Sequence, residues 1–373
     1  MVPDRNRRAV LATLAGLTCL PAASLCRAAE ARRRNEALLT LPIGRWTRIH
    51  EQKPGDAVTF RRQAHGGSAF DSRRGRIVLF GSDSHGKDWT NSPLFFDLAS
   101  LSWSRLYPDD PPTSYRVTAD GLPVAGPRGE HPWVMHTFGA VAYDPDADQL
   151  IVACYPEHMK PGRFTDALAD LWPKVKRHPT WVLDLSTGLW HALPGRAVHL
   201  FPYCAAFDSD RDELIGYARH GVYALSGPPR RWRRLAGKGL TSYHNNAVYD
   251  SKSKAVVVFG SNENSNDIVV FEPGSGRHEK MPTPGLRPPK DQHAPMAFHT
   301  RLGATVVLVD RDRQQAETWR YDLARDHWTA HPEAAIPFPL GMNYNMVYDP
   351  LHDLLLLVAA APGGPTAVWA LRL

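Results

Sequence analysis

A short pattern recurs six times along the chain and constrains its fold more than any other feature. The first copy begins with residues 75–82, whose centre is a run of apolar side chains. Residues 95–98 follow, with two aromatic residues and an aspartate, and Trp103 ends the copy. An aromatic residue, with Asp in most copies, marks the start of each later copy. These markers are Tyr143-Asp144, Phe207-Asp208, Tyr249-Asp250, Phe298 and Tyr348-Asp349. Each copy therefore contains short apolar strands that are separated by polar turns.

Repeats of roughly 35 to 65 residues with four short strands each are typical of a β-propeller, in which one repeat forms one blade. A single blade cannot bury its own faces, so the blades must close into a ring. We therefore predict an all-β protein with one kelch-type β-propeller of six blades over residues 32–373. A seventh blade would need strands within residues 108–128, a Pro- and Gly-rich segment that we expect to be a loop.

The two ends of the chain are expected to share one blade. The sixth repeat stops at Leu373 without a final strand that carries Trp. Residues 43–49, which include Trp46, have the same pattern as residues 101–106, which include Trp103. We expect the N-terminal strand to join the C-terminal blade and close the ring. The repeated tryptophans are expected to pack between blades; they are Trp103, Trp190, Trp232 and Trp328.

The first 31 residues have the pattern of a cleaved export signal. Arg7 and Arg8 precede an apolar run over residues 9–26, and small residues near position 30 offer a cleavage site. The paired arginines favour the twin-arginine route, so we expect a periplasmic or secreted protein. Pro21 interrupts the apolar run, which is therefore a poor permanent membrane span.

Charge and cysteine content narrow the partners of the mature chain. The formal net charge of +6 falls to about +4 once the leader, with four arginines and two acidic residues, is removed. This mildly basic balance suits an acidic partner, but no dense Lys/Arg block beyond residues 32–34 points to nucleic acid. We expect a monomer. Only Cys154 and Cys204 remain after cleavage, and whether they form a disulfide is left open.

Polar residues gather where a propeller ordinarily has small apolar ones. Aligning the repeats on their markers puts a set of polar side chains at the starts of the innermost strands. The set comprises His65, His136, Tyr203, His244, Asn245, His293 and Asn343. Two loops after second strands add His85, twenty residues after His65, and Arg219, sixteen residues after Tyr203. We expect these side chains to meet at one mouth of the central channel and to form a polar binding site.

The chain resembles the kelch and galactose-oxidase propeller superfamily over nearly all of its mature length. It is more specifically similar to propeller polysaccharide lyases of the ulvan-lyase kind. The similarity is in the type, order and spacing of His65, His85, Tyr203 and Arg219. Those lyases are usually described with seven blades, whereas we count six. The resemblance implies an exported enzyme that cleaves an acidic polysaccharide or oligosaccharide at uronic acids by β-elimination.

The chemistry of β-elimination fits these four residue types. Arg219 would neutralise the uronate carboxylate through two charged hydrogen bonds, which makes the neighbouring C5 proton more acidic. His65 would be the base and Tyr203 the proton donor, or the reverse, and His85 would orient them or act as a second acid or base. His244 and Asn245 would hold the carboxylate or an adjacent sugar, with further contacts from His136, His293 and Asn343. No cofactor and no catalytic metal is expected, and a structural ion is left open.

Three other functions compete with the lyase. A copper radical oxidase would use Tyr203, Cys204, Tyr243 and His244, but adjacent residues on a strand point to opposite faces, which separates Tyr203 from Cys204. A periplasmic sugar epimerase or mutarotase would need a similar acid and base without the arginine. A non-catalytic carbohydrate- or protein-binding propeller would need neither. A hydrolase is disfavoured because no pair of carboxylates falls at the channel mouth.

Overall fold

The computed structural model describes residues 34–58, 64–85, 88–195, 197–200, 203–263 and 265–373. The expected export signal, residues 1–31, lies outside the described residues. The helical segments are short, and they are α2 (Glu36–Leu39), η2 (Glu157–Met159), η3 (Trp172–Lys174), η4 (Leu323–Arg325) and η1 (Pro112–Ser114). In the described ranges, no helix is long and apolar enough to cross a bilayer. The protein is therefore all-β in its described part.

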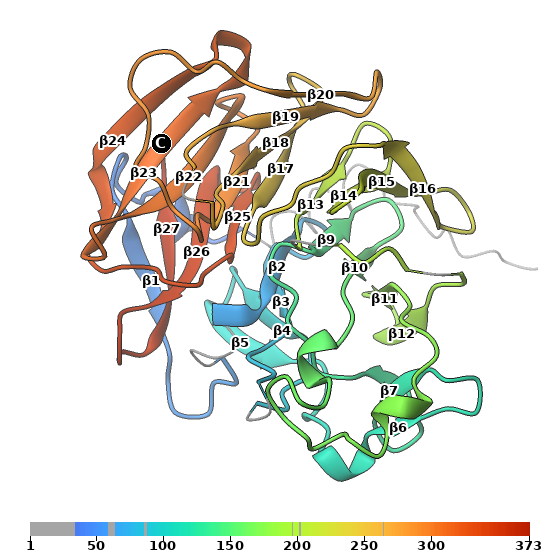
Figure 1. Ribbon diagram of the computed structural model, residues 1–373. Helices are drawn as coiled ribbons and strands as arrows, with labels where there is room; N and C mark the ends of the chain where they lie inside the picture. The colour runs from blue at the N-terminus through green and yellow to red at the C-terminus, as the bar shows by residue number, and fades with distance from the viewer. Residues whose placement is uncertain (1–33, 59–63, 86–87, 196, 201–202, 264) are drawn as a thin grey trace, which may run out of the picture.

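Six four-stranded antiparallel sheets make up most of the molecule, and we number them along the chain (Figure 1). Sheet 1 consists of β2 (Gly67–Asp71), β3 (Arg76–Phe80), β4 (Leu94–Asp97) and β5 (Ser102–Arg105). Sheet 2 consists of β9 (Val141–Asp144), β10 (Gln149–Val152), β11 (Trp181–Asp184) and β12 (Leu189–Ala192). Sheet 3 consists of β13 (Ala205–Asp208), β14 (Glu213–Ala218), β15 (Gly221–Ser226) and β16 (Arg231–Ala236). Sheet 4 consists of β17 (Asn246–Asp250), β18 (Ala255–Phe259), β19 (Val269–Glu272) and β20 (Arg277–Lys280). Sheet 5 consists of β21 (Met296–His299), β22 (Ala304–Arg311), β23 (Gln315–Asp322) and β24 (His327–Ile336). Sheet 6 consists of β25 (Met346–Asp349), β26 (Leu354–Ala360), β27 (Thr366–Leu371) and β1 (Thr47–Glu51).

The first strands of these sheets surround a central channel. Neighbours along the chain lie side by side in the order β2, β9, β13, β17, β21 and β25, and β25 lies beside β2. A cavity of about 320 Å³ is lined by residues from all six of these strands. Antiparallel sheets that radiate from a channel define a β-propeller.

The N-terminal strand completes the C-terminal sheet. β1 pairs antiparallel with β27, with Thr47 opposite Ala370 and Glu51 opposite Ala367. Trp46 lies just before β1 and is buried. The segment around Trp46 thus pairs beside the strand that ends at Leu371, as its sequence pattern predicts.

The aspartate of the repeated marker caps the turn between the first and second strands. Oδ1 of Asp144 accepts hydrogen bonds from the backbone N–H groups of Asp146 and Ala147 at 2.8 and 3.0 Å. Asp208 accepts equivalent bonds from Asp210 and Arg211. Such side-chain to backbone bonds fix tight turns, which gives the recurrence of Asp a local structural cause.

Outer-strand tryptophans contact the preceding sheet. The indole N–H of Trp232 in sheet 3 donates to Oγ1 of Thr180, just before the third strand of sheet 2, at 2.9 Å. The Trp328 ring lies 5.4 Å from the ring of Phe259 in sheet 4. Trp46 donates to Oγ1 of Thr318 in sheet 5 at 3.0 Å. The repeated tryptophan therefore joins each of these sheets to its neighbour.

The expectation that residues 108–128 form a loop is wrong. Three short strands, β6 (Arg116–Val117), β7 (Pro123–Ala125) and β8 (His131–Pro132), form a separate sheet there. Pro123 is compatible with this sheet because it is the first residue of its strand, where no ladder donor is required. The strands are too short for the periodicity of a sequence to reveal them.

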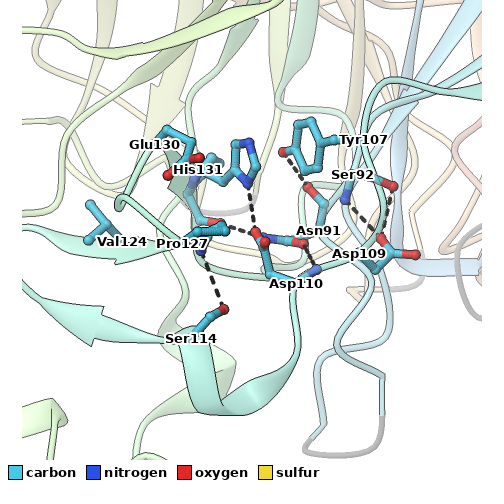
Figure 2. A network of polar contacts seen from close by, with 12 residues as sticks. Asn91, Ser92, Tyr107, Asp109, Asp110, Ser114, Val124, Pro127, Glu130 and His131 are labelled. Carbon is cyan, nitrogen blue, oxygen red and sulfur yellow. Dashed lines mark hydrogen bonds and ion pairs between the residues drawn. The ribbon is translucent and has the colours of Figure 1, made fainter.

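A polar network holds this small sheet against sheet 1 (Figure 2). The side-chain amide of Asn91 donates to Oδ2 of Asp110 at 2.9 Å and to the Pro132 carbonyl at 3.0 Å. The same carboxylate oxygen lies 2.7 Å from Nδ1 of His131, whose ring stacks on Tyr107 at 3.6 Å between centroids. These contacts fix the insertion to the propeller.

Candidate functional site

One cavity at the channel mouth collects most of the residues that were predicted to form the site. It has a volume of about 180 Å³, and we call it the histidine cavity. Its wall consists of His65, His85, His136, Phe138, His158, Arg163, Tyr203, Tyr243, His244, Asn262 and Met342. These residues come from segments before first strands and from loops after second strands. The two kinds of segment meet because antiparallel pairing puts Gly67, at the start of β2, opposite Phe80, at the end of β3.

Thr137 ties together the segments that carry three of the histidines. Its Oγ1 donates to the Phe80 carbonyl at 2.6 Å and accepts from the Gly67 N–H at 2.8 Å. Its own backbone N–H donates to the His65 carbonyl at 3.2 Å. The segments before β2 and β9 and the loop after β3 are thereby held in one arrangement.

Two glycines are required for this close approach. A Cβ on Gly67 would lie 2.1 Å from the carbonyl oxygen of Phe138. A Cβ on Gly81 would lie 2.2 Å from Oγ1 of Thr137, and the φ of Gly81 is +98°. Both positions therefore exclude a side chain, because backbone and a buried hydroxyl occupy the space.

Three imidazoles lie around the carboxylate of Asp83, and a fourth stacks on one of them. Oδ1 of Asp83 lies 2.6 Å from Nδ1 of His85, 3.6 Å from Nε2 of His136 and 3.8 Å from Nε2 of His65. The ring of His158 stacks on that of His136, with 3.8 Å between centroids. The His136 ring lies 4.5 Å from those of both His65 and His85. The site is thus a compact group of imidazoles built around one carboxylate.

Burial keeps the imidazoles of His65, His136 and His158 neutral near pH 7. It lowers the pKa of His65 to about 3 and that of His136 to about 4, and neighbouring imidazoles add to both effects. The pKa of His158 is lowered as well, first by burial and then by repulsion from His136. Burial opposes ionisation of Asp83, but its contacts with the imidazoles outweigh burial and lower its pKa. Neutral imidazoles with free lone pairs therefore face an ionised carboxylate.

Three bulky residues of the cavity have left-handed backbone conformations. Phe138, Tyr203 and His244 have φ values of 46°, 68° and 61°, and each comes shortly before a first strand. Their rings converge, since that of Phe138 lies 4.9 Å from Tyr203 and 5.9 Å from His244. Positive φ costs on the order of 1–3 kcal/mol for a bulky residue, and such strain concentrates at functional sites.

The Tyr203 hydroxyl is buried, and within the described residues it has no hydrogen-bond partner. A buried, unsatisfied hydroxyl costs about 1–3 kcal/mol, which a bound ligand would recover. Nδ1 of His65 is likewise buried without a partner in the described ranges. Both groups line the histidine cavity and can take part in proton transfer with a ligand.

Arg163 supplies a positive charge to the cavity that was not predicted. It lies on the long connection between β10 and β11, and its Nη1 donates to Oε2 of Glu157 at 2.9 Å. A guanidinium has five N–H donors in a planar fork, so this contact uses only part of it. The same connection carries His158 into the cavity.

A small apolar cluster beneath this connection holds His158 and Arg163 in place. Met159 is fully buried there together with Leu168, and both pack with Trp133 and Ala125 of the inserted segment. The insertion over residues 108–132 therefore has a positional role. It supports the loop that brings an imidazole and a guanidinium to the channel mouth.

Arg219 does not line the histidine cavity, which corrects the predicted pairing of Tyr203 with Arg219. It lines a separate hollow of about 960 Å³ that also includes Lys176, Arg177, His178, His199 and His220. The reason is the length of its loop, because β14 ends at Ala218 and β15 begins at Gly221. A two-residue hairpin cannot extend over the channel. We call this second depression the basic hollow.

His244 lines the histidine cavity as predicted, and His293 lies at its border. Their rings are 4.5 Å apart, but His293 lines an adjacent hollow of about 690 Å³, which shares Met342 with the histidine cavity. Nδ1 of His244 is hydrogen-bonded to the hydroxyl of Tyr344. Burial lowers the pKa of His244 to about 4 and that of His293 to about 3.

Asn245 and Asn343, which the sequence predicted to bind substrate, line neither the histidine cavity nor the basic hollow. The side-chain amide of Asn343 donates to the Val358 carbonyl at 3.1 Å, and that of Asn245 donates to the Gly260 carbonyl. Both side chains are buried. They satisfy backbone groups next to the channel, which a sequence pattern cannot distinguish from ligand binding.

Cys154 and Cys204 are buried free thiols. Cys204 packs with Ala206 and Tyr217, whereas Tyr203 packs with Phe138 in a different cluster. The side chains of the adjacent residues Tyr203 and Cys204, just before β13, thus pack into different clusters. A tyrosine–cysteine cross-link would require them on one side.

No protein family model and no curated protein matches the chain. Among solved structures, the chain is similar to TolB from Acinetobacter baumannii at 11% sequence identity and a TM-score of 0.45. The similarity covers 79% of this chain and 62% of that chain. The assignment of a β-propeller rests on the sheet topology of the protein itself.

Proposed function

We propose that this protein is an exported polysaccharide lyase, on a six-bladed kelch-type propeller, that cleaves a uronate-containing polysaccharide by β-elimination. The observation that carries the proposal is the convergence of His65, Tyr203 and Arg163 on one cavity. These groups can supply a base, a proton donor and a partner for a carboxylate. They come from segments of the three consecutive sheets 1, 2 and 3, so their meeting requires that these sheets pack side by side.

The reaction needs each of these three groups. A base removes the proton from C5 of the uronate, the electron pair forms the C4=C5 double bond, and the bond from C4 to the glycosidic oxygen breaks. A proton donor then protonates the departing oxygen. The ionised carboxylate on C5 opposes loss of the C5 proton, so a cation must neutralise it.

Arg163 takes the role that the sequence resemblance implies for Arg219. Its guanidinium lines the histidine cavity and keeps donors beyond the one that contacts Glu157. A planar fork can form two parallel bonds with a carboxylate. Arg219 lies in the basic hollow, where it can contact a neighbouring acidic sugar.

His65 is the proposed base and Tyr203 the proposed proton donor. The imidazole of His65 is neutral near pH 7, and its buried Nδ1 has no partner among the described residues. The Tyr203 hydroxyl likewise has no hydrogen-bond partner among the described residues. His85, held by Asp83, orients the substrate or the base.

The basic hollow supports an extended anionic substrate. Its wall combines three cationic side chains with Tyr155 and Trp232, and it includes no carboxylate. Cations bind acidic groups, and aromatic faces pack against sugar rings. Tyr155 comes shortly before His158 on one connection, so this hollow adjoins the cavity.

The test is to incubate the mature protein with a panel of uronate-containing polysaccharides. We expect an increase in ultraviolet absorbance from the C4=C5 double bond, and no reaction with polymers whose carboxyl groups are reduced to alcohols. Depolymerisation without this absorbance would indicate hydrolysis and contradict the proposal. Binding without cleavage of any polymer would favour the non-catalytic carbohydrate-binding alternative.

A further inference from the structure

We propose that His85, His136 and His158 form a binding site for one divalent transition-metal ion, with Zn²⁺ as the best-suited ion. The inference goes beyond β-elimination and rests only on the geometry of the histidine cavity. One ring nitrogen from each of these residues lies within 4.8 Å of the other two. The site would bind the metal ion whether or not the protein cleaves a uronate.

The spacing suits a three-imidazole site after a small adjustment of side chains. Zn–N bonds of about 2.0–2.1 Å in a tetrahedron separate the ligand nitrogens by roughly 3.3 Å. The ring centroids are 3.8 Å apart for His136 and His158 and 4.5 Å apart for His85 and His136. Rotation of the imidazoles about χ2 is sufficient to bring three nitrogens onto one ion.

Asp83 prepares His85 for this role. Its Oδ1 lies 2.6 Å from Nδ1 of His85, so the carboxylate and that ring nitrogen form a close ion-pair contact. We therefore assign the other ring nitrogen, Nε2, as the ligand atom. A carboxylate behind a metal-binding histidine is a common arrangement, because it orients the ring and makes the free nitrogen more basic.

His136 provides independent support. Only 1% of this residue is exposed, and in the described ranges neither of its ring nitrogens has a hydrogen-bond partner. Two unsatisfied nitrogens in a buried ring cost about 1–3 kcal/mol each. A metal ion would satisfy one of them.

The alternative set of His65, Asp83 and His85 is less suitable. A metal between Asp83 and His85 would break their 2.6 Å ion-pair contact, because two ligands of one ion are separated by about 3 Å or more. The proposed set keeps that contact. It also leaves His65 and Tyr203 free to handle protons.

The proposed site would have an open coordination position. Three imidazole ligands leave at least one position of a tetrahedral ion for water or a substrate oxygen, as in catalytic zinc sites. That position would face the cavity of about 180 Å³. Imidazole ligands favour zinc, copper, nickel or iron over calcium and magnesium, which prefer oxygen.

The experiment measures metal binding without any substrate. The untagged mature protein is stripped with a chelator and dialysed, Zn²⁺ is titrated in, and bound metal is determined by elemental analysis. We expect one Zn²⁺ per chain. Co²⁺ substituted at the site should give the visible absorption of a four-coordinate ion with nitrogen ligands. Failure of the lyase assay would leave this measurement unaffected.

Four variants and one control locate the ion. His136→Ala and His158→Ala should weaken Zn²⁺ binding by on the order of 100-fold or more, and Asp83→Asn by about 10- to 100-fold. His178→Ala, in the basic hollow, should bind like the wild type. Substitution of the buried His136 or His158 can prevent folding. His85→Gln is therefore included, because His85 lies on a partly exposed loop and its substitution should leave the fold intact. Absence of stoichiometric binding, or unchanged binding in His136→Ala and His85→Gln, would overturn the proposal.

Discussion

Oδ1 of Asp83 lies 2.6 Å from Nδ1 of His85, so one carboxylate pairs with a partly exposed imidazole of the cavity. Asp83 follows β3 by three residues, and His85 follows by five. The pair is therefore a local feature of one loop. The other imidazoles reach it from different parts of the chain.

The first prediction concerns this pair. Asp83→Asn should reduce turnover of a uronate polysaccharide by about 10- to 100-fold, because an amide cannot impose the same tautomer on His85. Melting temperature should change little, since the loop is partly exposed. The control is Asp312→Asn, a change at an exposed aspartate outside the histidine cavity. Equal activity in the Asp83→Asn protein and the wild type would contradict the role of this carboxylate.

The second prediction separates the two arginines. Arg163→Ala should lower kcat/KM by on the order of 1,000-fold, because it removes the cation opposite the substrate carboxylate. Arg163→Lys should recover little of this loss. Arg219→Ala should raise KM and leave kcat nearly unchanged, because Arg219 lies in the basic hollow. The reverse ranking in steady-state kinetics would restore the assignment implied by the sequence resemblance.

The third prediction tests the proton-transfer groups. Tyr203→Phe and His65→Ala should each lower kcat by roughly two to four powers of ten, with an unchanged melting temperature. Tyr223→Phe is a matched control, because Tyr223 lines the basic hollow and not the histidine cavity. A small effect of Tyr203→Phe, of the size found for Tyr223→Phe, would remove Tyr203 from the mechanism.

The fourth prediction tests the close approach at Gly81. Gly81→Ala should lower the free energy of unfolding by roughly 2–4 kcal/mol, because it adds both a strained φ and a contact with Thr137. Gly55 has a similar φ of +95° with open space around its Cα. Gly55→Ala should therefore cost only about 1 kcal/mol. Chemical denaturation of both variants measures the difference, and equal losses would show that backbone strain alone decides the effect.

The repeats predicted the all-β propeller because each marker residue has a structural role close to its own position in the sequence. The aspartate caps a turn and the tryptophan packs on the preceding sheet, so both are visible in a short window of sequence. His65 and His244 were found because both stand five residues before those markers, whereas Tyr203 stands four before its marker and His85 was found in the loop after a second strand. His136, two positions away from that alignment, was found only as part of the same polar set.

The missed residues depend on tertiary structure. His158 and Arg163 lie on a long connection, and their position follows from the packing of Met159 against an inserted sheet. No periodicity in the sequence encodes that packing. The only available signal was the unusual length of the interval between β10 and β11. Arg219 was misplaced for the converse reason, since its interval is a two-residue hairpin.

The last prediction concerns pH-dependent stability at Asp310. Its carboxylate accepts backbone hydrogen bonds from Leu340 at 2.6 Å and Gly341 at 2.9 Å, next to Asp291. Burial, followed by repulsion from Asp291, raises the pKa of Asp310 to about 6. The folded protein thus binds a proton at pH values where the unfolded chain has already released it. The contribution of this group to stability is therefore greatest below about pH 4 and falls as pH rises to about 6.

Asp310→Asn removes this titration and should change the pH profile of unfolding. Relative to the wild type, the variant should gain on the order of 2 kcal/mol between pH 4 and pH 7, because only the wild type must ionise a buried carboxyl. The variant also loses one side-chain oxygen that accepts a hydrogen bond from a backbone N–H. This loss is independent of pH, so it cancels when the free energies of unfolding at the two pH values are compared. Asp312→Asn, at an exposed neighbour, should follow the wild-type profile. Urea unfolding at both pH values measures the difference, and parallel profiles for the wild type and Asp310→Asn would mean that the carboxyl of Asp310 is not perturbed by burial.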